Sequence, residues 1–301
     1  MEIGEHMGNK RNYAQMDGEL QDRKMRTVIR DKGSNWSEVT SGVPQGSVLA
    51  PIMFQIYIND MHEGLKSYIN MFADDAKLLK VIKSQRDCEE LQKDIDKIYE
   101  WSLKWKLEFN AKKCHVMELG KSRRRPIWEY KMGKEVIKKS KEEKDLGVVV
   151  QDNLSPEAHI RGVFGSTYRM LTNIRVAFHY MDMSMMKKII TTMVRPKLEY
   201  AAVVWSPHHK KDIRKLERIQ RIATKMVPDL RDLTYEDRLM EIELPTLQSR
   251  RERGDLVMMY KIISEKEKID IENMVVLTED RDRNRRPKLE NILRKLTRAS
   301  V

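Results

Sequence analysis

The chain has 301 residues, of which 40% are hydrophobic and 35% are charged, a composition typical of a folded protein with a heavily charged surface. Lysine and arginine outnumber aspartate and glutamate by 58 to 46, and the formal net charge of +12 favours a polyanionic partner, either nucleic acid or an anionic membrane surface. There is no apolar run of the ~20 residues that a membrane span needs, no signal-peptide pattern and, with only Cys88 and Cys114, no disulfide framework. We therefore expect an intracellular protein of the nucleus or cytoplasm, neither secreted nor membrane-spanning.

The N-terminal part predicts a polar lead-in followed by a β-hairpin. Residues 1–20 are polar and rich in glycine, which predicts little order. The alternating run at residues 23–31 predicts a strand, the cluster at residues 31–36 a turn, and residues 37–40 a return strand.

The next stretch predicts a loop that leads into an apolar helix. The loop "SGVPQGS" spans residues 41–47, and its glycines would let the backbone approach a ligand closely. Gln45 offers both donors and an acceptor, while Ser47 is suited to cap a helix that ends after Ile58. A plain helix-entry loop is the alternative interpretation.

Two adjacent aspartates, Asp74 and Asp75, lie inside the apolar run at residues 68–79. Because aspartate favours turns and both flanks are rich in strand formers, the segment predicts a hairpin with the pair at its tip. Two carboxylates at a tip suit Mg²⁺, which takes one or two carboxylates together with substrate phosphates. The alternative is a solvated turn, although such a turn would not need Phe72 and Ala73 directly before it.

The region after the hairpin predicts one long helix and several short strands. Ser84 and Asp87 have the spacing of a capping box, and the apolar positions that follow predict a helix packed on the sheet of the aspartates. Residues 106–109, 114–119 and 146–150 read as short strands.

From about residue 156 the pattern becomes helical. Helices are predicted over residues 184–200, 210–226 and near 247–263, with a final short helix after the charged tail that starts at residue 279. The predicted fold class is α+β: an antiparallel sheet with packed helices, followed by an all-α region.

One predicted helix concentrates cations, several of them opposite its apolar face. They are Lys210, Lys211, Arg214, Lys215, Arg218, Arg221 and Lys225. Such a helix could follow a nucleic-acid backbone through salt-dependent contacts, or it could simply be solvated. Further cations occur at residues 123–125 and at Arg250, Arg251 and Arg253, whereas Trp205 is expected in the core.

Several motifs follow one another in a fixed order. They are "SGVPQGSVLAP", "FADD", "WSLKWKLEFNAKKCHVMELG", "KEEKDLGVVV", "MVRPKLEYAAVVWSP" and "LERIQRIATKM". In this order and spacing they resemble the reverse transcriptases of non-LTR retrotransposons, the LINE elements of the jockey and chicken-repeat type. The resemblance covers roughly residues 20 to 263. It implies an RNA-directed DNA polymerase of a mobile element, with a partial polymerase palm followed by a thumb-like helical region.

The resemblance also implies roles for single residues. Asp74 would be the principal metal ligand and Asp75 a second one, in a two-metal nucleotidyl transfer with Mg²⁺ or Mn²⁺. Phe72 would lie near the primer end or the incoming nucleotide, and Lys113 would neutralise or protonate the leaving pyrophosphate unless it is an ordinary surface lysine. Residues 146–148 would support the primer strand. Contacts to the template and the incoming nucleotide are implied for Gly42, Pro44, Gln45, Gly46 and Ser47.

The implied partners are an RNA template, a DNA primer and deoxynucleoside triphosphates. The predicted subdomains are residues 1–40, a lead-in and hairpin remnant of fingers and palm, residues 41–155, the palm, and residues 156–301, a helical thumb and C-terminal region. The family's third metal-binding aspartate, on a strand upstream of the loop at residues 41–47, has no counterpart here. We therefore expect an N-terminally truncated fragment with impaired activity. The alternatives are a non-catalytic remnant that binds template–primer through the palm edge and the basic helices, or a generic basic scaffold protein.

Overall fold

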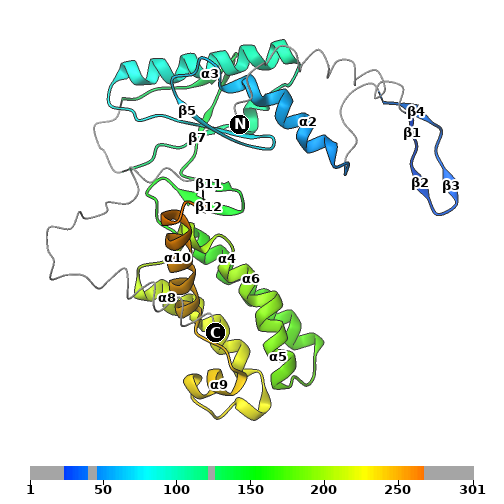
Figure 1. The fold of residues 1–301 in the computed structure, drawn as a ribbon, viewed down its shortest axis with the longest axis vertical. Coiled ribbons are helices and arrows are strands. Elements are labelled where there is room, and N and C mark those ends of the chain that lie inside the picture. The colour runs from blue at the N-terminus through cyan, green and yellow to red at the C-terminus, as the bar shows by residue number, and fades with distance from the viewer. Residues whose placement is uncertain (1–23, 40–45, 121–125, 268–301) are drawn as a thin grey trace. The chain divides into compact units, whose positions relative to one another are not determined.

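The computed structural model describes residues 24–39, 46–120 and 126–267 of the chain (Figure 1). Within these residues, every sheet is a pair of short strands, and helices form most of the second half. This mixture of helices and small sheets agrees with the predicted α+β class.

The chain divides into two compact units. We call Met1–Cys114 with Arg124–Ile137 the hairpin unit, and His115–Arg123 with Lys138–Val301 the helical unit. Compactness does not test the functional subdomains predicted with borders at residues 40 and 155, and those borders stay a prediction.

The first described segment is the predicted N-terminal hairpin. Strand β1 (Lys24–Met25) pairs antiparallel with β4 (Ser37–Glu38), and β2 (Val28–Ile29) pairs with β3 (Lys32–Gly33). The turn is shorter than predicted, since the chain reverses directly after β2 at Arg30, whose φ is 53°.

Helix α2 (Leu49–Ile58) begins where the sequence predicts it. The Ser47 hydroxyl accepts a hydrogen bond from the amide of Ala50 at 3.0 Å and so satisfies a free donor of the first turn. The α-helix ends at Ile58, as predicted, and the 3₁₀ helix η1 (Asn59–His62) continues directly from it.

Helix α3 (Gln85–Trp105) follows the hairpin of β5 (Tyr68–Phe72) and β6 (Asp75–Leu79). The predicted capping box is present, since the Asp87 carboxylate accepts from the backbone amide of Ser84 at 2.8 Å and from its hydroxyl at 2.9 Å.

The chain after α3 differs from the sequence prediction. Residues 106–109 are not a strand; Leu107 and Phe109 instead pack against the core of the hairpin unit, which holds the chain without a ladder partner. The 3₁₀ turn η2 (Ala111–Lys113) leads to β7 (His115–Val116), a strand shorter than predicted.

Two further strand pairs are formed by β7 and the residues that follow it. Strand β7 pairs in parallel with β10 (Lys138–Lys139), and β8 (Lys131–Met132) forms a hairpin with β9 (Glu135–Val136). Gly133 has φ 60° in the latter turn, and a Cβ there would lie 2.6 Å from the Tyr99 ring, so both backbone and packing require glycine.

Strand β11 (Glu142–Asp145) pairs antiparallel with β12 (Val148–Gln151). The strand predicted from residue 146 therefore starts two residues later, because Leu146 (φ 44°) and Gly147 (φ 87°) form the turn between the two strands.

The first helix of the helical unit is α4 (Glu157–Ala177). The helix predicted next is one run of α5 (Met183–Ile189), η3 (Ile190–Val194) and α6 (Arg195–Glu199), and its central part is a π-helix. Figure 1 shows α5 and α6 in line beside α4.

The remaining helices complete this unit. They are α7 (Ala202–Trp205), α8 (Lys210–Lys225), the 3₁₀ helix η4 (Pro228–Leu230), α9 (Tyr235–Ile242) and α10 (Leu247–Ile263). Helices α8 and α10 confirm the two predicted from the sequence.

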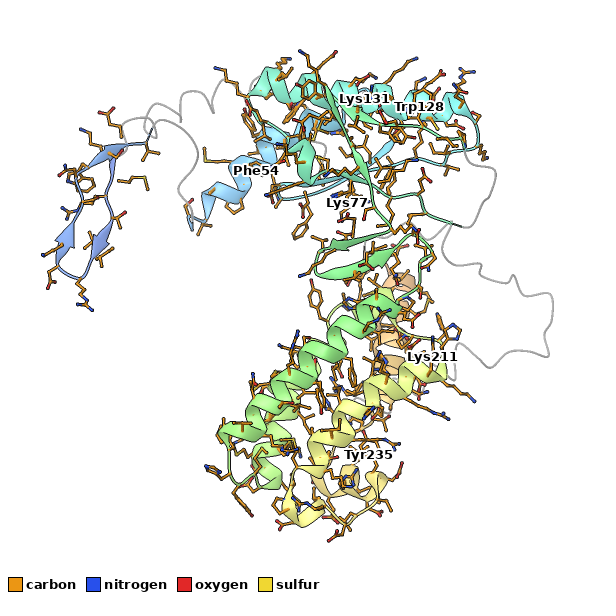
Figure 2. The ribbon with its side chains drawn as sticks, turned by 180° about the vertical axis from the view of Figure 1, so that it is seen from behind. Phe54, Lys77, Trp128, Lys131, Lys211 and Tyr235 are labelled. Atoms are coloured by element: carbon orange, nitrogen blue, oxygen red, sulfur yellow. The ribbon has the colours of Figure 1, made fainter. Side chains whose placement is uncertain are left out.

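The main hydrophobic core lies among these helices. Ile160, Leu171, Met186, Leu198 and Leu216 are among its fully buried members. Trp205 is 4% exposed and belongs to this core, as predicted. A buried polar network runs through it, in which the Glu217 carboxylate accepts from the Tyr235 hydroxyl and from the amide of Leu247. Figure 2 labels Tyr235 in this unit.

Candidate active site and nucleic-acid surface

The aspartate pair lies at the tip of a regular β-hairpin, as predicted. Phe72 pairs with Asp75 across the strands, so Ala73 and Asp74 form a two-residue turn. Ala73 adopts φ 51°, the positive value that such tight hairpin turns require at a central residue.

Both carboxylates are exposed, and so is Phe72, with 62% of its surface accessible. The apolar flank therefore does not bury the pair, contrary to what the sequence suggests. Residues alternate along β5, so Ile69 and Met71 face the protein while Phe72 lies on the open face. Among the described residues, neither Asp74 nor Asp75 has a side-chain hydrogen bond or ion pair, which leaves their oxygens available to a cation.

One face of the hairpin packs against α3, as predicted. Ile69, Met71 and Leu78 are half-buried and surround the small core to which Ile98 and Trp101 of α3 contribute. Figure 2 labels Lys77 on this hairpin and Phe54 of α2, whose side chain packs in the same cluster.

A buried carboxylate of α3 holds the start of this hairpin. Asp94 is 1% exposed and accepts hydrogen bonds from the hydroxyl and the amide of Ser67, at 2.6 and 2.7 Å, and from the amide of Lys66 at 3.1 Å. Burial alone would raise the pKa of Asp94, but these bonds outweigh it and keep the pKa below its usual range. Asp94 therefore stays ionised and anchors the strand that ends in the aspartate pair.

A second carboxylate of α3 binds the second strand of the hairpin at the same open end, since Tyr68 pairs with Leu79. Glu90 forms an ion pair at 3.0 Å with Lys80, which directly follows β6, and a longer one at 3.4 Å with Lys66. Sequence analysis missed both Asp94 and Glu90, because they look like ordinary charged positions of an amphipathic helix.

The predicted nucleotide-contact loop is only partly within the described residues. Gly42, Pro44 and Gln45 lie outside them. Gly46 has φ 82° and open space around the position of a Cβ, and Ser47 caps α2. The positive φ accounts for glycine at this position, and contact with a nucleotide stays a prediction for the whole loop.

Lys113 is exposed at the end of η2, and that turn lies against β9. Nothing in the described contacts brings it to Asp74 or Asp75, so its proposed role toward pyrophosphate also stays a prediction.

The turn predicted to support the primer strand is held by the helical unit's own Tyr200. Its hydroxyl donates to the carbonyl of Leu146 at 2.9 Å. A Cβ at Gly147 would lie 3.1 Å from the Tyr200 ring, which adds a packing reason for glycine to the positive φ.

The cations of α8 form one exposed stripe, which we call the α8 stripe. Its members are Lys211, Arg214, Arg218, Arg221 and Lys225, spaced three and four residues apart on the face opposite the buried Leu216 and Ile219. Figure 2 labels Lys211 near the start of this helix.

Not all the predicted cations lie on the stripe or are equally free. Lys215 is half-buried with its ammonium 5.6 Å from the Phe164 ring, and Lys211 and Arg221 form long ion pairs with Glu157 and Glu236. For Arg214, Arg218 and Lys225, no side-chain partner is found among the described residues. The stripe is thus mostly uncompensated positive charge.

Two arginines suggested as further contacts are not free, exposed cations. Arg250 binds the Glu199 carboxylate with two hydrogen bonds, of 2.5 and 2.7 Å, and Arg251 is buried. Residues 123–125 lie outside the described part of the chain.

The part of the chain that the structure describes holds no group of three or more histidine, cysteine, aspartate or glutamate side chains that could bind a metal ion. Within the same residues, no helix is both long and apolar enough to cross a membrane.

Comparison with known proteins gives one family and several relatives. Residues 10–150 match the model of the reverse transcriptase (RNA-dependent DNA polymerase) family. The probable RNA-directed DNA polymerase from transposon X-element of Drosophila melanogaster is 24% identical over 222 residues, which cover 69% of this chain and 24% of that protein. The RNA-directed DNA polymerase from mobile element jockey of Drosophila funebris is 28% identical over 217 residues, which cover 68% of this chain and 23% of that protein.

A third relative is the probable RNA-directed DNA polymerase from transposon BS of Drosophila melanogaster, 22% identical over 236 residues, or 72% of this chain and 25% of the relative. The chain thus spans about a quarter of the length of these curated relatives. No solved structure matches it significantly. These findings support a LINE-like reverse transcriptase, and the chain is related to the RNA-directed DNA polymerases of non-LTR retrotransposons.

Proposed function

We propose that this chain carries part of the active site of an RNA-directed DNA polymerase, with Asp74 and Asp75 as metal ligands. The observation that supports this role best is the pair of exposed, unpartnered carboxylates at the tip of a hairpin anchored to α3. The anchors Asp94 and Glu90 fix the hairpin without using the carboxylates at its tip.

The two aspartates fit Mg²⁺ or Mn²⁺ as a partial ligand set. Hard oxygen donors suit both ions, and Mg²⁺ is commonly held by one or two carboxylates, with substrate phosphates and water as the other ligands. When bound, such ions stabilise the charge on the attacking and leaving oxygens of phosphoryl transfer. Weak or absent primer extension by the 301-residue chain itself is part of this proposal, because two carboxylates are only a partial ligand set for two ions.

The other predicted roles belong to the same proposal. Phe72 would contact the primer end or incoming nucleotide from the open face of the hairpin, and Gly46 and Ser47 would do so from the start of α2. Lys113 would act on pyrophosphate, and residues 146–148 would support the primer. The hairpin region would be a palm and the helices a thumb.

A second candidate function is nucleic-acid binding without catalysis. The α8 stripe supports it, because uncompensated cations along one helix face suit the phosphates of an RNA template and a DNA primer. Both functions use the same partners, and deoxynucleoside triphosphates would be needed only for the first.

Direct metal binding and primer extension test the proposal together. Mn²⁺ affinity is measured for the chain, for Asp74→Asn, and for Asp31→Asn, a matched control at an exposed turn position of the N-terminal hairpin. We expect Asp74→Asn to weaken Mn²⁺ binding by at least about tenfold, while Asp31→Asn leaves it unchanged. Extension of a DNA primer on an RNA template should be weak in all three.

The outcomes separate the parts of the proposal. Unchanged Mn²⁺ affinity in Asp74→Asn contradicts the metal-ligand role. Strong extension that Asp74→Asn abolishes keeps that role and contradicts the weak activity. Strong extension that survives the substitution contradicts both.

A further inference from the structure

The helical unit contains an open groove of about 640 Å³ between α4 and the helix run α5–η3–α6. This volume lies within the ~300–1,000 Å³ typical of ligand sites. One face of the second half of α4 forms one wall, while residues of η3 and α6 form the other. The side chains used below are Arg169, Met170, Asn173, Phe178, Met193 and Lys197.

The second wall has an unusual backbone, and the sequence accounts for it. Pro196 lacks an amide hydrogen and would clash with the preceding turn of a regular α-helix. The helix widens instead: the amide of Arg195 bonds to the carbonyl five residues back, on Ile190. The hydroxyls of Thr191 and Thr192 bond to carbonyls of the preceding turn, with a shortest distance of 2.7 Å. Such π-turns occur frequently at functional sites.

The π-turn shapes the groove directly. Met193 lies within it and Lys197 follows one turn later, and both line the groove with largely exposed side chains. In a regular α-helix, Lys197 would point in a different direction around the helix axis. The widened turn therefore determines which side chains form this wall.

The charge of the groove points to an anion. Arg169 of α4 and Lys197 of α6 stand on opposite walls, and no aspartate or glutamate is among the described residues that line the groove. Neither cation has an ion pair or side-chain hydrogen bond within the described part of the chain. Two free cations on facing walls would repel each other less with an anion between them.

The groove also offers an apolar surface beside the two cations. Phe178, directly after α4, is 45% exposed, and Met193 is 44% exposed, so the groove leaves an aromatic ring and a thioether open to water. Asn173 adds donor and acceptor capacity without charge. Single-stranded nucleic acid has this chemistry, because its phosphates need cations and its bases stack on aromatic rings in a sequence-tolerant way.

We infer that this groove is a second nucleic-acid site, distinct from the α8 stripe, which binds a single-stranded segment. Arg169 and Lys197 bind its phosphates, and a base rests against Phe178 and Met193. The inference rests on the proposed function in one respect only, that the chain works on nucleic acid. An acidic peptide would satisfy the two cations but would leave the aromatic ring without a stacking partner.

Binding of fluorescein-labelled oligo(U) and oligo(dT), measured by anisotropy over a range of salt concentrations, tests the inference. Arg169→Gln and Lys197→Gln should each weaken binding about 3- to 10-fold and lower the salt slope by about one. Phe178→Ala should weaken binding by at least about 5-fold with the salt slope unchanged. The matched control is Arg175→Gln, an exposed position of α4 outside the groove.

Each outcome decides one question. Arg218→Gln, on the α8 stripe, is titrated in parallel. Loss of binding only in Arg218→Gln overturns the groove and keeps the nucleic-acid function. Loss in the groove variants but not in Arg218→Gln keeps the groove and contradicts the stripe. Equal loss in Arg175→Gln, or no binding by the parent chain at low salt, overturns the groove site.

Two further measurements test the fold of the variants and the chemical nature of the anion. The near-ultraviolet circular dichroism spectrum, to which all five tryptophans contribute, should be unchanged in every variant if the fold is intact. A poly-glutamate peptide should compete poorly with oligo(U). Tighter binding of that peptide, lost in Arg169→Gln, would assign the groove to an acidic protein partner and overturn the nucleic-acid site.

Discussion

The two compact units differ in how they are held together. The helical unit has a continuous core in which Leu216, Ile190 and Val194 are completely buried. The hairpin unit buries only a few side chains around Ile58 and Ile98, and it relies on the Asp94 and Glu90 anchors to fix its β5–β6 hairpin. The aspartate pair is therefore carried by the part with fewer apolar contacts, as is common where binding or chemistry needs exposed groups.

The difference extends to the open face of the hairpin. Tyr68 is 66% exposed, Phe72 62% and Leu79 45%, and Tyr68 pairs with Leu79 across the strands. In the helical unit, by contrast, the paired strands β11 and β12 place Val148 in the core. An exposed apolar sheet face of this extent is typical of a surface that binds another molecule.

The largest contrast is expected from truncating one core leucine in each unit. Leu216→Ala should cost about 2–5 kcal/mol, because Leu216 is completely buried and its neighbours cannot easily fill the cavity. Leu78→Ala, at a half-buried position on the packed face of the hairpin, should cost roughly 1 kcal/mol. Amide exchange of α8 measures the first change, and amide exchange of β5 and β6 measures the second. Equal costs would contradict the contrast between the units.

A smaller effect is expected from the polar anchor of the hairpin unit. Asp94→Asn replaces a charged acceptor of three groups and should cost about 1–3 kcal/mol. Amides of β5 should then exchange faster, while those of α8 should be unaffected. The matched control is Asp96→Asn, an exposed position of the same helix.

The sign of the pH dependence gives a further test of this anchor. The pKa of Asp94 is lowered in the folded state, so its stabilisation is complete above the unfolded value of about 4 and is lost as the pH falls through the folded value. The Asn variant should lack this loss, and its stability should approach that of the parent chain in strong acid. An unchanged acid profile would mean that Asp94 does not anchor the hairpin.

The sequence predicted the elements whose signals are local. The capping box at Ser84, the hairpin of the aspartates and the amphipathic pattern of α8 all appear where predicted. The strand predicted over residues 106–109 was wrong, because side-chain packing and not strand pairing holds these residues. The strand predicted from Leu146 failed because the turn lies there.

The site was predicted in part for the same reason. Asp74 and Asp75 could be identified from their neighbours in sequence, but their exposure depends on which face of β5 packs against α3. Asp94 bonds to Ser67, which lies 27 positions away, and Tyr200 bonds to Leu146, which lies 54 positions away. No periodicity in a single sequence reports such pairs. The π-turn was missed because Pro196 also fits a kink or a helix end.

The smallest effect on stability is expected from His159 of α4. Its contacts make the helical unit sensitive to acid at a milder pH than the hairpin unit. Its Nδ1 accepts a hydrogen bond from the amide of Val149 at 3.2 Å, and its ring packs edge-on against Trp205 with centroids 4.8 Å apart. Burial lowers the pKa of His159 in the folded state, so the unfolded chain binds the proton first.

Stability of the helical unit should therefore begin to fall as the pH drops below the unfolded histidine value of about 6.5, well before Asp94 affects the hairpin unit. His159→Asn keeps an acceptor near the position of Nδ1 and cannot titrate, so its stability should be flat over this range, at a cost of roughly 1 kcal/mol from the lost ring contact. Free energies of unfolding from amide exchange of α4 and α8, measured between pH 7 and 5 in the parent chain and the variant, check both. If the parent and the variant lose stability equally, a group other than His159 takes up the proton. The two units would then not be distinguished by the pH range in which each loses stability.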